Sequence, residues 1–270
     1  MKGVPDVLKR IVERKRREIS ELGKDEEIFL RAETSKNSFY DAITKEGVNI
    51  IAEHKRNSPS NKRKGNPLFG PGSTPYHIGG LYAKGGAAAM SVLTDFQGFG
   101  GRLEHLVYAR EGLVEESRPD IPILRKDFII DPVQIYESRY YGADAILLIA
   151  AILDESQLRD YIRIASSLGM DALVESHTVE ELEKSIAAGA RIYGVNNRNL
   201  HTFEEDIHTT RRILANHRDI YPVVAESSIE TFADIQTISA ANPNVTAYLI
   251  GTHLMRSNDP VTKLREFQGL

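Results

Sequence analysis

The chain has 270 residues, close to the ~250 residues of a typical eight-stranded α/β barrel, with 41% hydrophobic and 27% charged residues. This composition argues against disordered and membrane-spanning classes, and the formal net charge of -4 excludes a global positive field that would gather nucleic acid or anionic lipid. Because the chain has no cysteine, disulfides, thiolate nucleophiles and cysteine zinc sites are also excluded.

Targeting and metal-binding signals are missing from the sequence. No apolar run approaches the ~20 residues of a membrane-spanning helix, and the N-terminus lacks the apolar stretch of a signal peptide. The eight histidines form neither an HxH nor an HExxH group. We therefore expect a cytoplasmic protein that binds no metal, needs no cofactor and has no membrane or nucleic-acid partner.

The first 25 residues predict an extra helix before the main fold. Its apolar positions have helical spacing and form one face: Val4, Val7, Leu8, Ile11, Val12, Ile19 and Leu22. This face is expected to pack on the rest of the protein. The basic run from Arg10 to Arg17 leaves an RNA-binding arm as an alternative, but a solvated face is favoured because acidic residues are interspersed: Glu13, Glu18, Glu21 and Asp25.

From residue 48 onward, short apolar runs alternate with amphipathic stretches of helical length, a pattern typical of successive βα units. Eight strands are predicted, at 48–55, 88–94, 122–126, 145–149, 172–175, 192–196, 223–226 and 248–251. Helices with good capping signals are expected at 131–141, 154–168 and 178–188.

Eight such units predict an α/β fold of the (β/α)8 TIM-barrel type. An open, doubly wound sheet is the alternative, and the absence of a GxGxxG turn weakens it. We expect residues 1–270 to form a single domain, in which 1–47 is a helical extension packed on the barrel and 48–270 contain the eight units.

Polar side chains end several of the predicted strands, where an apolar core would not accept them. They are Glu53 and Lys55 on the first strand, Lys126 on the third, Glu175 on the fifth, Asn196 on the sixth and Glu226 on the seventh. Because side chains alternate along a strand, residues two apart point to the same side. The charged groups are therefore expected to converge on one mouth of the barrel, as in sites with tuned catalytic pKa values.

Two further segments are placed where a barrel carries function. The loop from residue 57 to 74 exceeds the usual two to six residues of such connections, and we interpret it as an active-site lid, with a disordered insertion as the alternative. The small residues Ser227, Ser228, Gly251 and Thr252 follow the last two strands, where barrels commonly bind phosphate.

Taken in order, the motifs resemble those of the indole-3-glycerol-phosphate synthase family over nearly the whole chain. They are IIAEHKRNSPS at 50–60, GGAAAMSVLTD at 85–95, PILRKDFIIDPVQIYESRYYGADAILLIAAIL at 122–153, LVESHTVEELEKSIAAGARIYGVNNRNL at 173–200, VAESSI at 224–229 and YLIGTHLM at 248–255. The resemblance implies ring closure, decarboxylation and dehydration of a carboxyphenylamino-deoxyribulose phosphate during tryptophan biosynthesis, by acid–base catalysis. We expect the protein to act as a monomer without a cofactor.

The same resemblance implies roles for particular residues. Lys126 would be the general acid, Lys55 would bind the substrate carboxylate or assist proton transfer, and Glu53 and Glu175 would be acid or base in the dehydration. The remaining contacts would come from Asn196, which orients the substrate, Arg198 at a substrate anion, Ser58 in the lid, Phe99 against the aromatic ring, and Ser227, Ser228, Gly251 and Thr252 at the phosphate.

Three segments depart from the family pattern. The lid reads SPSNKRKG where SPSKG is usual, GFGGR at 98–102 keeps one aromatic ring and adds an arginine, and Ser228 stands where glycine is usual. If that position needs a positive φ, serine costs about 1 kcal/mol or more there.

Two other functions stay open at the level of sequence. A Schiff-base aldolase would use Lys126 or Lys55 as the nucleophile, and borohydride trapping would detect it. A non-catalytic barrel would only bind a phosphorylated ligand, or would hold RNA on its basic N-terminal helix.

Overall fold

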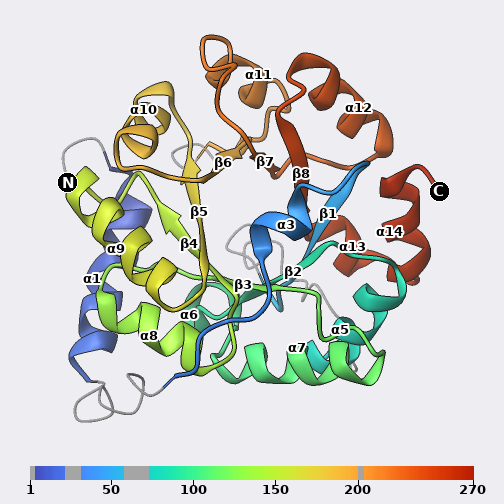
Figure 1. Ribbon diagram of the computed structural model, residues 1–270, viewed down its shortest axis with the longest axis horizontal. Helices are drawn as coiled ribbons and strands as arrows, with labels where there is room; N and C mark the ends of the chain where they lie inside the picture. Colours follow the sequence, from blue (N-terminus) through green and yellow to red (C-terminus); the bar gives the residue numbers. More distant parts are fainter. Residues whose placement is uncertain (1–3, 22–31, 58–72, 200–203) are drawn as a thin grey trace.

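The computed structural model describes residues 4–21, 32–57, 73–199 and 204–270. Eight parallel strands form a closed barrel in the order β1 to β8 (Figure 1). Their bounds are β1 (Asn49–His54), β2 (Ala89–Leu93), β3 (Ile123–Lys126), β4 (Ala145–Ile149), β5 (Asp171–Ser176), β6 (Ile192–Asn196), β7 (Val223–Glu226) and β8 (Val245–Ile250). The predicted (β/α)8 barrel is confirmed, and the open sheet is excluded because β1 pairs with both β2 and β8.

Most predicted strands match within one or two residues, but β8 begins three residues earlier than expected. Val245 and Thr246 precede the apolar run at 248–251, and both are β-branched residues that favour strands. Val245 pairs with Val223 of β7, next to a register shift in that ladder. The sequence reading missed this start because it followed the apolar run alone.

Helices surround the barrel and connect its strands. Their bounds are α1 (Asp6–Ser20), α3 (Phe39–Ile43), α5 (Pro75–Lys84), α6 (Phe96–Phe99), α7 (Glu104–Glu115), α8 (Pro132–Tyr140), α9 (Glu155–Ser167), α10 (Val179–Ala187), α11 (Thr209–Ile213), α12 (Phe232–Ala241), α13 (Thr252–Arg256) and α14 (Pro260–Gln268). The predicted capping signals are confirmed: Asp131 and Asp154 form capping boxes, and the Thr178 side chain accepts from the Glu181 N–H. None of the helices in the described ranges is long and apolar enough to cross a membrane.

Two apolar clusters hold the barrel together. One lies between the strands and the outer helices. The other fills the barrel interior, where Phe39 and Ile43 of α3 pack with Leu124, Leu173 and other strand residues. Because α3 closes the end of the barrel at which β1 begins, an open mouth is left only at the carboxyl ends of the strands.

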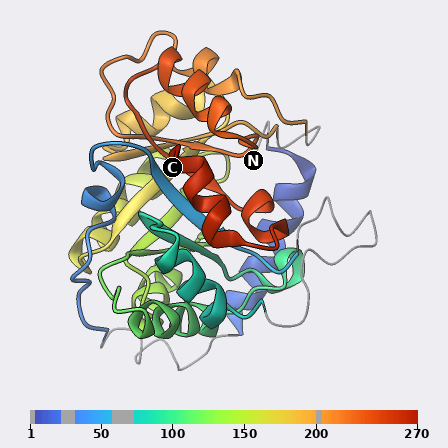
Figure 2. The same cartoon turned by 90° about the vertical axis from the view of Figure 1, so that its right-hand side faces the viewer.

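Helix α1 lies at the barrel end opposite α3 (Figure 2). Its Leu8 and Val12 are buried. Lys15 is also buried, with its ammonium 3.1 Å from Asp95 and 2.9 Å from Asp127. The helix is thus fixed at the strand carboxyl ends by apolar and ionic contacts. The assignment of residues 1–270 to a single domain stays a prediction.

Candidate active site

A cavity of about 420 Å³ lies at the carboxyl ends of the strands. It is lined by all but one of the site residues expected from the sequence: Glu53, Lys55, Phe99, Lys126, Glu175, Asn196, Arg198, Ser227, Ser228, Gly251 and Thr252. The exception, Ser58, lies outside the described residues, as does most of the expected lid at 57–74. Barrel closure therefore gathers side chains from six strand ends into one space.

Lys126 lies at the centre of the charged groups in this cavity. Its Nζ is 2.9 Å from Glu175 Oε2 and 2.6 Å from Glu226 Oε2, and all three side chains are largely buried. Burial alone would lower the pKa of Lys126, but the charges of Glu175, Glu226 and Glu53 outweigh it and raise the pKa above the usual value. Lys126 is therefore an ammonium at neutral pH, the form that a general acid requires.

Glu53 and Lys55 point to the same side of β1, as the two-residue spacing predicts. Lys55 Nζ donates to Glu53 Oε1 at 2.7 Å. Burial raises the pKa of Glu53, but the charges of Lys55, Lys126 and Arg198 lower it to below the usual value. Glu53 is thus a buried carboxylate that stays ionised because cations surround it.

Gly251 leaves room for this pair. A Cβ at position 251 would overlap Glu53 Oε1 and would lie 3.0 Å from Lys55 Nζ. A larger residue at the end of β8 would therefore displace the Glu53 carboxylate.

Asn196 and Arg198 form the wall at the end of β6. The Asn196 side chain accepts from the Arg198 backbone N–H at 3.0 Å, and the Arg198 guanidinium pairs with Glu205, with Nε 2.8 Å from Oε1. The Arg198 side chain is 25% exposed. It lies at the rim of the cavity, where an anionic group could compete with Glu205 for the guanidinium.

The residues after β7 have an unusual backbone conformation. Ser227 and Ser228 have φ values of 66° and 62°, in the left-handed region that favours glycine. The condition stated for Ser228 is thus met, because the residue has a positive φ; the cost of serine there stays a prediction. Ser227, Ser228, Gly251 and Thr252 line the same cavity as Lys126, so one ligand can contact both ends of it.

The comparisons agree with this geometry. A family model described as indole-3-glycerol phosphate synthase matches residues 8–267. An indole-3-glycerol phosphate synthase of Desulfotalea psychrophila is 45% identical over 257 residues, which cover 93% of this chain and 94% of that protein. One of Dehalococcoides mccartyi is 46% identical over 223 residues, 81% of each chain.

The chain belongs to the indole-3-glycerol phosphate synthase family. The predictions of the family and of a synthase activity in tryptophan biosynthesis are therefore confirmed. A solved thiamine phosphate pyrophosphorylase of Pyrococcus furiosus has a TM-score of 0.58 at 14% identity, covering 84% of this chain and 96% of that one. That likeness shows the barrel fold alone.

Glu226 is a residue of the synthase family site for which the sequence predicts no role. Its charge at the end of β7 is the signal that could have identified it. The side chain is 1% exposed and pairs directly with Lys126. A buried carboxylate in contact with the expected general acid belongs to the site.

The sequence reading also missed the contribution of α1. Val7, Leu8 and Ile11 line the cavity, although their apolar spacing predicted only packing. The aromatic part of this cavity is made by Phe99 and Phe128, whose ring centroids are 6.5 Å apart. Helical spacing identified the apolar face of α1, but it carries no information on what that face covers.

The GFGGR departure from the family pattern has a clear local structure. Gly100 is left-handed at the end of α6, and a Cβ on Gly101 would overlap the carbonyl oxygen of Leu93. Arg102 stacks over the exposed Phe96 ring at 4.7 Å. Phe99 is thus the aromatic residue of this segment that lines the cavity.

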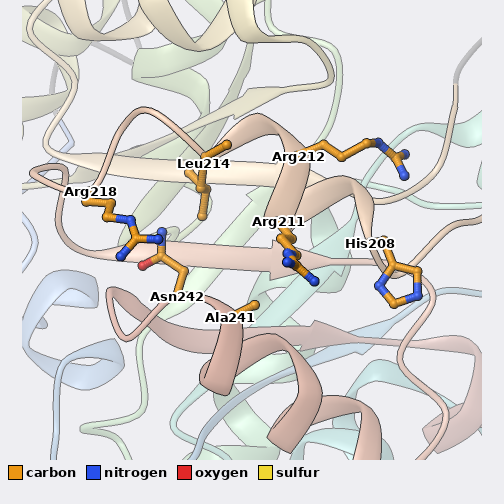
Figure 3. A pocket seen from close by; sticks show the side chains of 8 residues that line it. His208, Arg211, Arg212, Leu214, Arg218, Ala241 and Asn242 are labelled. Carbon is orange, nitrogen blue, oxygen red and sulfur yellow. The ribbon is translucent and has the colours of Figure 1, made fainter.

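A second hollow of about 450 Å³ lies between α11 and α12 (Figure 3). It is lined by His208, Arg211, Arg212, Leu214, Ala215, Arg218, Ala241 and Asn242. Its basic side chains are on exposed residues, and Arg212 is paired with Asp206 at 2.6 Å. None of the expected site residues lines it.

Across the described ranges, no group of three or more His, Asp or Glu side chains is arranged to hold a metal ion.

Proposed function

We propose that this cavity binds the carboxyphenylamino-deoxyribulose phosphate and closes its indole ring, with Lys126 as the general acid. One observation carries the proposal: the Lys126 ammonium is held by Glu175 and Glu226 inside a cavity that also contains Glu53, Lys55 and an aromatic wall. Acid–base chemistry on a phosphorylated aromatic substrate needs these groups together.

In the first step, the ring carbon that bears the carboxylate forms a bond to the ketone carbon of the sugar. The ketone oxygen gains negative charge as this bond forms, and Lys126 transfers a proton to it. A preorganised ammonium stabilises such developing charge because it needs no rearrangement at that moment. The carboxylate then leaves as carbon dioxide, and the electrons of the broken bond restore the aromatic ring.

In the second stage, the new alcohol leaves as water after it is protonated, and a base removes the ring proton to give the indole double bond. We assign these two proton transfers to Glu53 and Glu175, which lie beside Lys55 and Lys126 respectively. Lys55 binds the substrate carboxylate or assists one of these proton transfers. Because neighbouring cations lower the pKa of both carboxylates, the one that protonates the hydroxyl must first receive a proton from its own ammonium partner, Lys55 or Lys126.

The rest of the substrate is bound by the walls of the cavity. Phe99 contacts the aromatic ring, Asn196 orients the substrate and Arg198 binds an anionic group. The phosphate lies against Ser227, Ser228, Gly251 and Thr252, and Ser58 contributes from the lid. No cofactor, metal or nucleic acid takes part, and the chain acts as a cytoplasmic monomer; these statements remain predictions.

The test supplies the substrate and follows the indole product by fluorescence. We expect Lys126→Ala to lower kcat by about 10²- to 10⁴-fold, the usual contribution of one acid. Circular dichroism checks that the variant is folded. Lys84→Ala serves as the control, because Lys84 makes an exposed ion pair with Glu116 on the outer helices. Equal activity of Lys126→Ala and the unchanged chain would reject the role of Lys126.

The Schiff-base alternative is disfavoured by the electrostatics of the site. A nucleophilic lysine needs a lowered pKa, whereas the carboxylates raise the pKa of Lys126. Borohydride with a ketose phosphate should therefore leave no adduct on Lys126. The RNA-binding alternative is weakened as well, since Arg14 and Lys15 of the basic run are paired with Asp95.

A further inference from the structure

His177 lies directly behind the charged cluster, in the turn between β5 and α10. Its Nε2 is 3.3 Å from Glu175 Oε1, and its Nδ1 is 3.3 Å from Glu181 Oε2. The side chain is only 8% exposed. The backbone N–H of His177 also donates to Glu181 at 2.7 Å. Nε2 has no hydrogen-bond partner among the described residues, so the imidazole lies at ion-pair distance between one carboxylate of the cavity and one carboxylate of α10, and it can act on Glu175 through its charge.

The two carboxylates that share Lys126 have unequal surroundings. Glu175 contacts Lys126 through Oε2 and His177 through Oε1. Glu226 contacts Lys126 through Oε2, and its Oε1 is buried without a hydrogen-bond partner among the described residues. That oxygen faces Gly194 of β6, where a Cβ would come within 2.6 Å of it. Glu175 therefore lies at ion-pair distance from two basic side chains, Lys126 and His177, whereas Glu226 contacts Lys126 and interacts with His177 only at longer range.

This difference matters because two buried carboxylates that share one site do not both ionise easily. One ammonium compensates one negative charge, so the pair tends to keep a proton. On the Lys126 contacts alone, the shorter distance of 2.6 Å to Glu226, against 2.9 Å to Glu175, would favour ionisation of Glu226. The charge of His177 must therefore determine whether Glu175 or Glu226 is ionised.

We propose that His177 is a positioning residue that keeps Glu175 ionised and leaves the shared proton on Glu226. The inference deepens the proposed function and rests on it for its catalytic meaning. It assigns Glu175 as the base of the cavity. It also makes Glu226 a proton reserve, that is, a carboxylic acid that can return a proton to Lys126 after Lys126 has given its own to the substrate.

The charges around the three groups support this assignment. Burial raises the pKa of Glu175, but Lys126 and His177 outweigh it and hold that pKa below the usual range. Burial and the charge of Glu175 raise the pKa of Glu226, in spite of Lys126. Burial lowers the pKa of His177, but Glu181, Glu175 and Glu226 together raise it, so the imidazole carries positive charge more readily than a free histidine.

The proton balance of the ring closure shows what the reserve would do. Lys126 loses one proton to the ketone oxygen and becomes a neutral amine. Glu226 then transfers its proton across the 2.6 Å contact to Lys126 Nζ and becomes a carboxylate. The ammonium is restored before the dehydration begins, and Lys126 and a protonated His177 together then compensate the charges of Glu226 and Glu175.

The direct test uses the free enzyme labelled with ¹³C at the glutamate side-chain carboxyls. Resonances are assigned with Glu175→Gln and Glu226→Gln, and their chemical shifts are followed against pH by NMR. We expect a titration near neutral pH on Glu226 and none there on Glu175. In His177→Gln, which keeps a hydrogen-bond donor but carries no charge, the titration near neutral pH should move largely to Glu175.

Kinetics give a second readout. The acidic limb of the kcat profile, which reports protonation of Glu175, should move upward by about one pH unit in His177→Gln, because an opposite charge at this distance is worth one or more units. Glu181→Gln keeps the imidazole but removes one of its carboxylates, so a smaller shift in the same direction is expected. His208→Gln is the matched control, since His208 lies in the exposed hollow of Figure 3, and it should shift nothing.

The outcomes are distinct. Identical carboxyl titrations in His177→Gln and the unchanged chain would overturn the proposal, and so would a titration near neutral pH on Glu175 of the unchanged chain. Because the NMR titration needs no substrate, it decides the role of His177 even if the enzyme fails to close the indole ring. Failure of turnover in the unchanged chain would instead reject the proposed function.

Discussion

Lys15 of α1 places its ammonium 2.9 Å from Asp127, the residue that directly follows Lys126 at the end of β3. Asp127 is further held by Arg125 and by the Thr94 hydroxyl, which donates to it at 2.5 Å. Burial raises the pKa of Asp127, but Lys15 and Arg125 outweigh it and lower the pKa strongly. One buried ion pair therefore links the N-terminal helix to the strand that presents the expected general acid.

Replacing Lys15 with methionine should loosen this link. The change leaves Asp127 and Asp95 with one fewer buried cation, and we expect the free energy of unfolding to fall by about 3 kcal/mol, the usual cost of removing one partner of a buried pair. KM should rise more than kcat falls, because α1 also lines the cavity with Val7, Leu8 and Ile11. Urea unfolding and steady-state kinetics measure both effects.

The control for this prediction lies on the same helix. Lys9 makes an exposed pair with Asp6, so Lys9→Met should change stability by less than about 1 kcal/mol and leave KM unchanged. Equal effects of the two substitutions would show that the buried pair of Lys15 does not hold α1 in place.

Gly251→Ala should disturb the Glu53–Lys55 pair directly. Its Cβ would overlap Glu53 Oε1, so the carboxylate must move, and a displacement of about 1 Å in a catalytic group can cost about 10²-fold in rate. We expect a loss of this size in kcat, measured by indole fluorescence. Gly80→Ala in α5 is the matched control, because its Cβ would meet Glu116 at an ordinary 3.5 Å; if both variants lose activity alike, the close approach at Gly251 is not the cause.

Ser228→Gly should stabilise the chain without loss of function. A serine at a φ of 62° costs roughly 1 kcal/mol, and its hydroxyl is buried without a hydrogen-bond partner among the described residues. We expect a gain of up to about 1 kcal/mol in thermal unfolding, and inorganic phosphate should bind at least as tightly by calorimetry. Weaker phosphate binding would mean that the Ser228 hydroxyl is a ligand.

Ser117 provides the comparison for Ser228. It has a φ of 59° and follows α7 on the outside of the barrel. Ser117→Gly should give a similar gain in stability and no change in phosphate affinity, which separates backbone strain from ligand contact.

His54 predicts how stability depends on pH. The side chain is fully buried, and burial, with smaller contributions from His105 and Arg56, lowers its pKa to about 4. Below about pH 6.5, His54 therefore binds a proton in the unfolded chain but not in the folded chain. The contribution of His54 to the free energy of unfolding is fully present above pH 6.5. About 3 kcal/mol of it is lost as the pH falls from 6.5 to 4.

His54→Gln should flatten this part of the stability curve, measured by urea unfolding across the same pH range. His208→Gln, at an exposed position, should keep the slope of the unchanged chain. A slope that persists in His54→Gln would assign the acid sensitivity to other groups.

Much of the fold was predictable from local pattern. Each strand needs only a short apolar run and each helix a capped amphipathic stretch, so the eight units could be counted without knowing their partners. The start of β8 was missed because Val245 and Thr246 lie outside the apolar run. The expected site residues were found at strand ends because charge there has no place in an apolar core.

Local sequence pattern was thus enough to predict the barrel and the chemical groups at its mouth. Which of these groups come into contact depends on the tertiary structure, because Lys126 lies 49 residues from Glu175 and 100 residues from Glu226 along the chain. Barrel closure brings them within hydrogen-bond distance, and only then do burial and neighbouring charge separate one carboxylate from the other. The place of α1 over the cavity was decided in the same way, since periodicity defines an apolar face but not the surface that it covers.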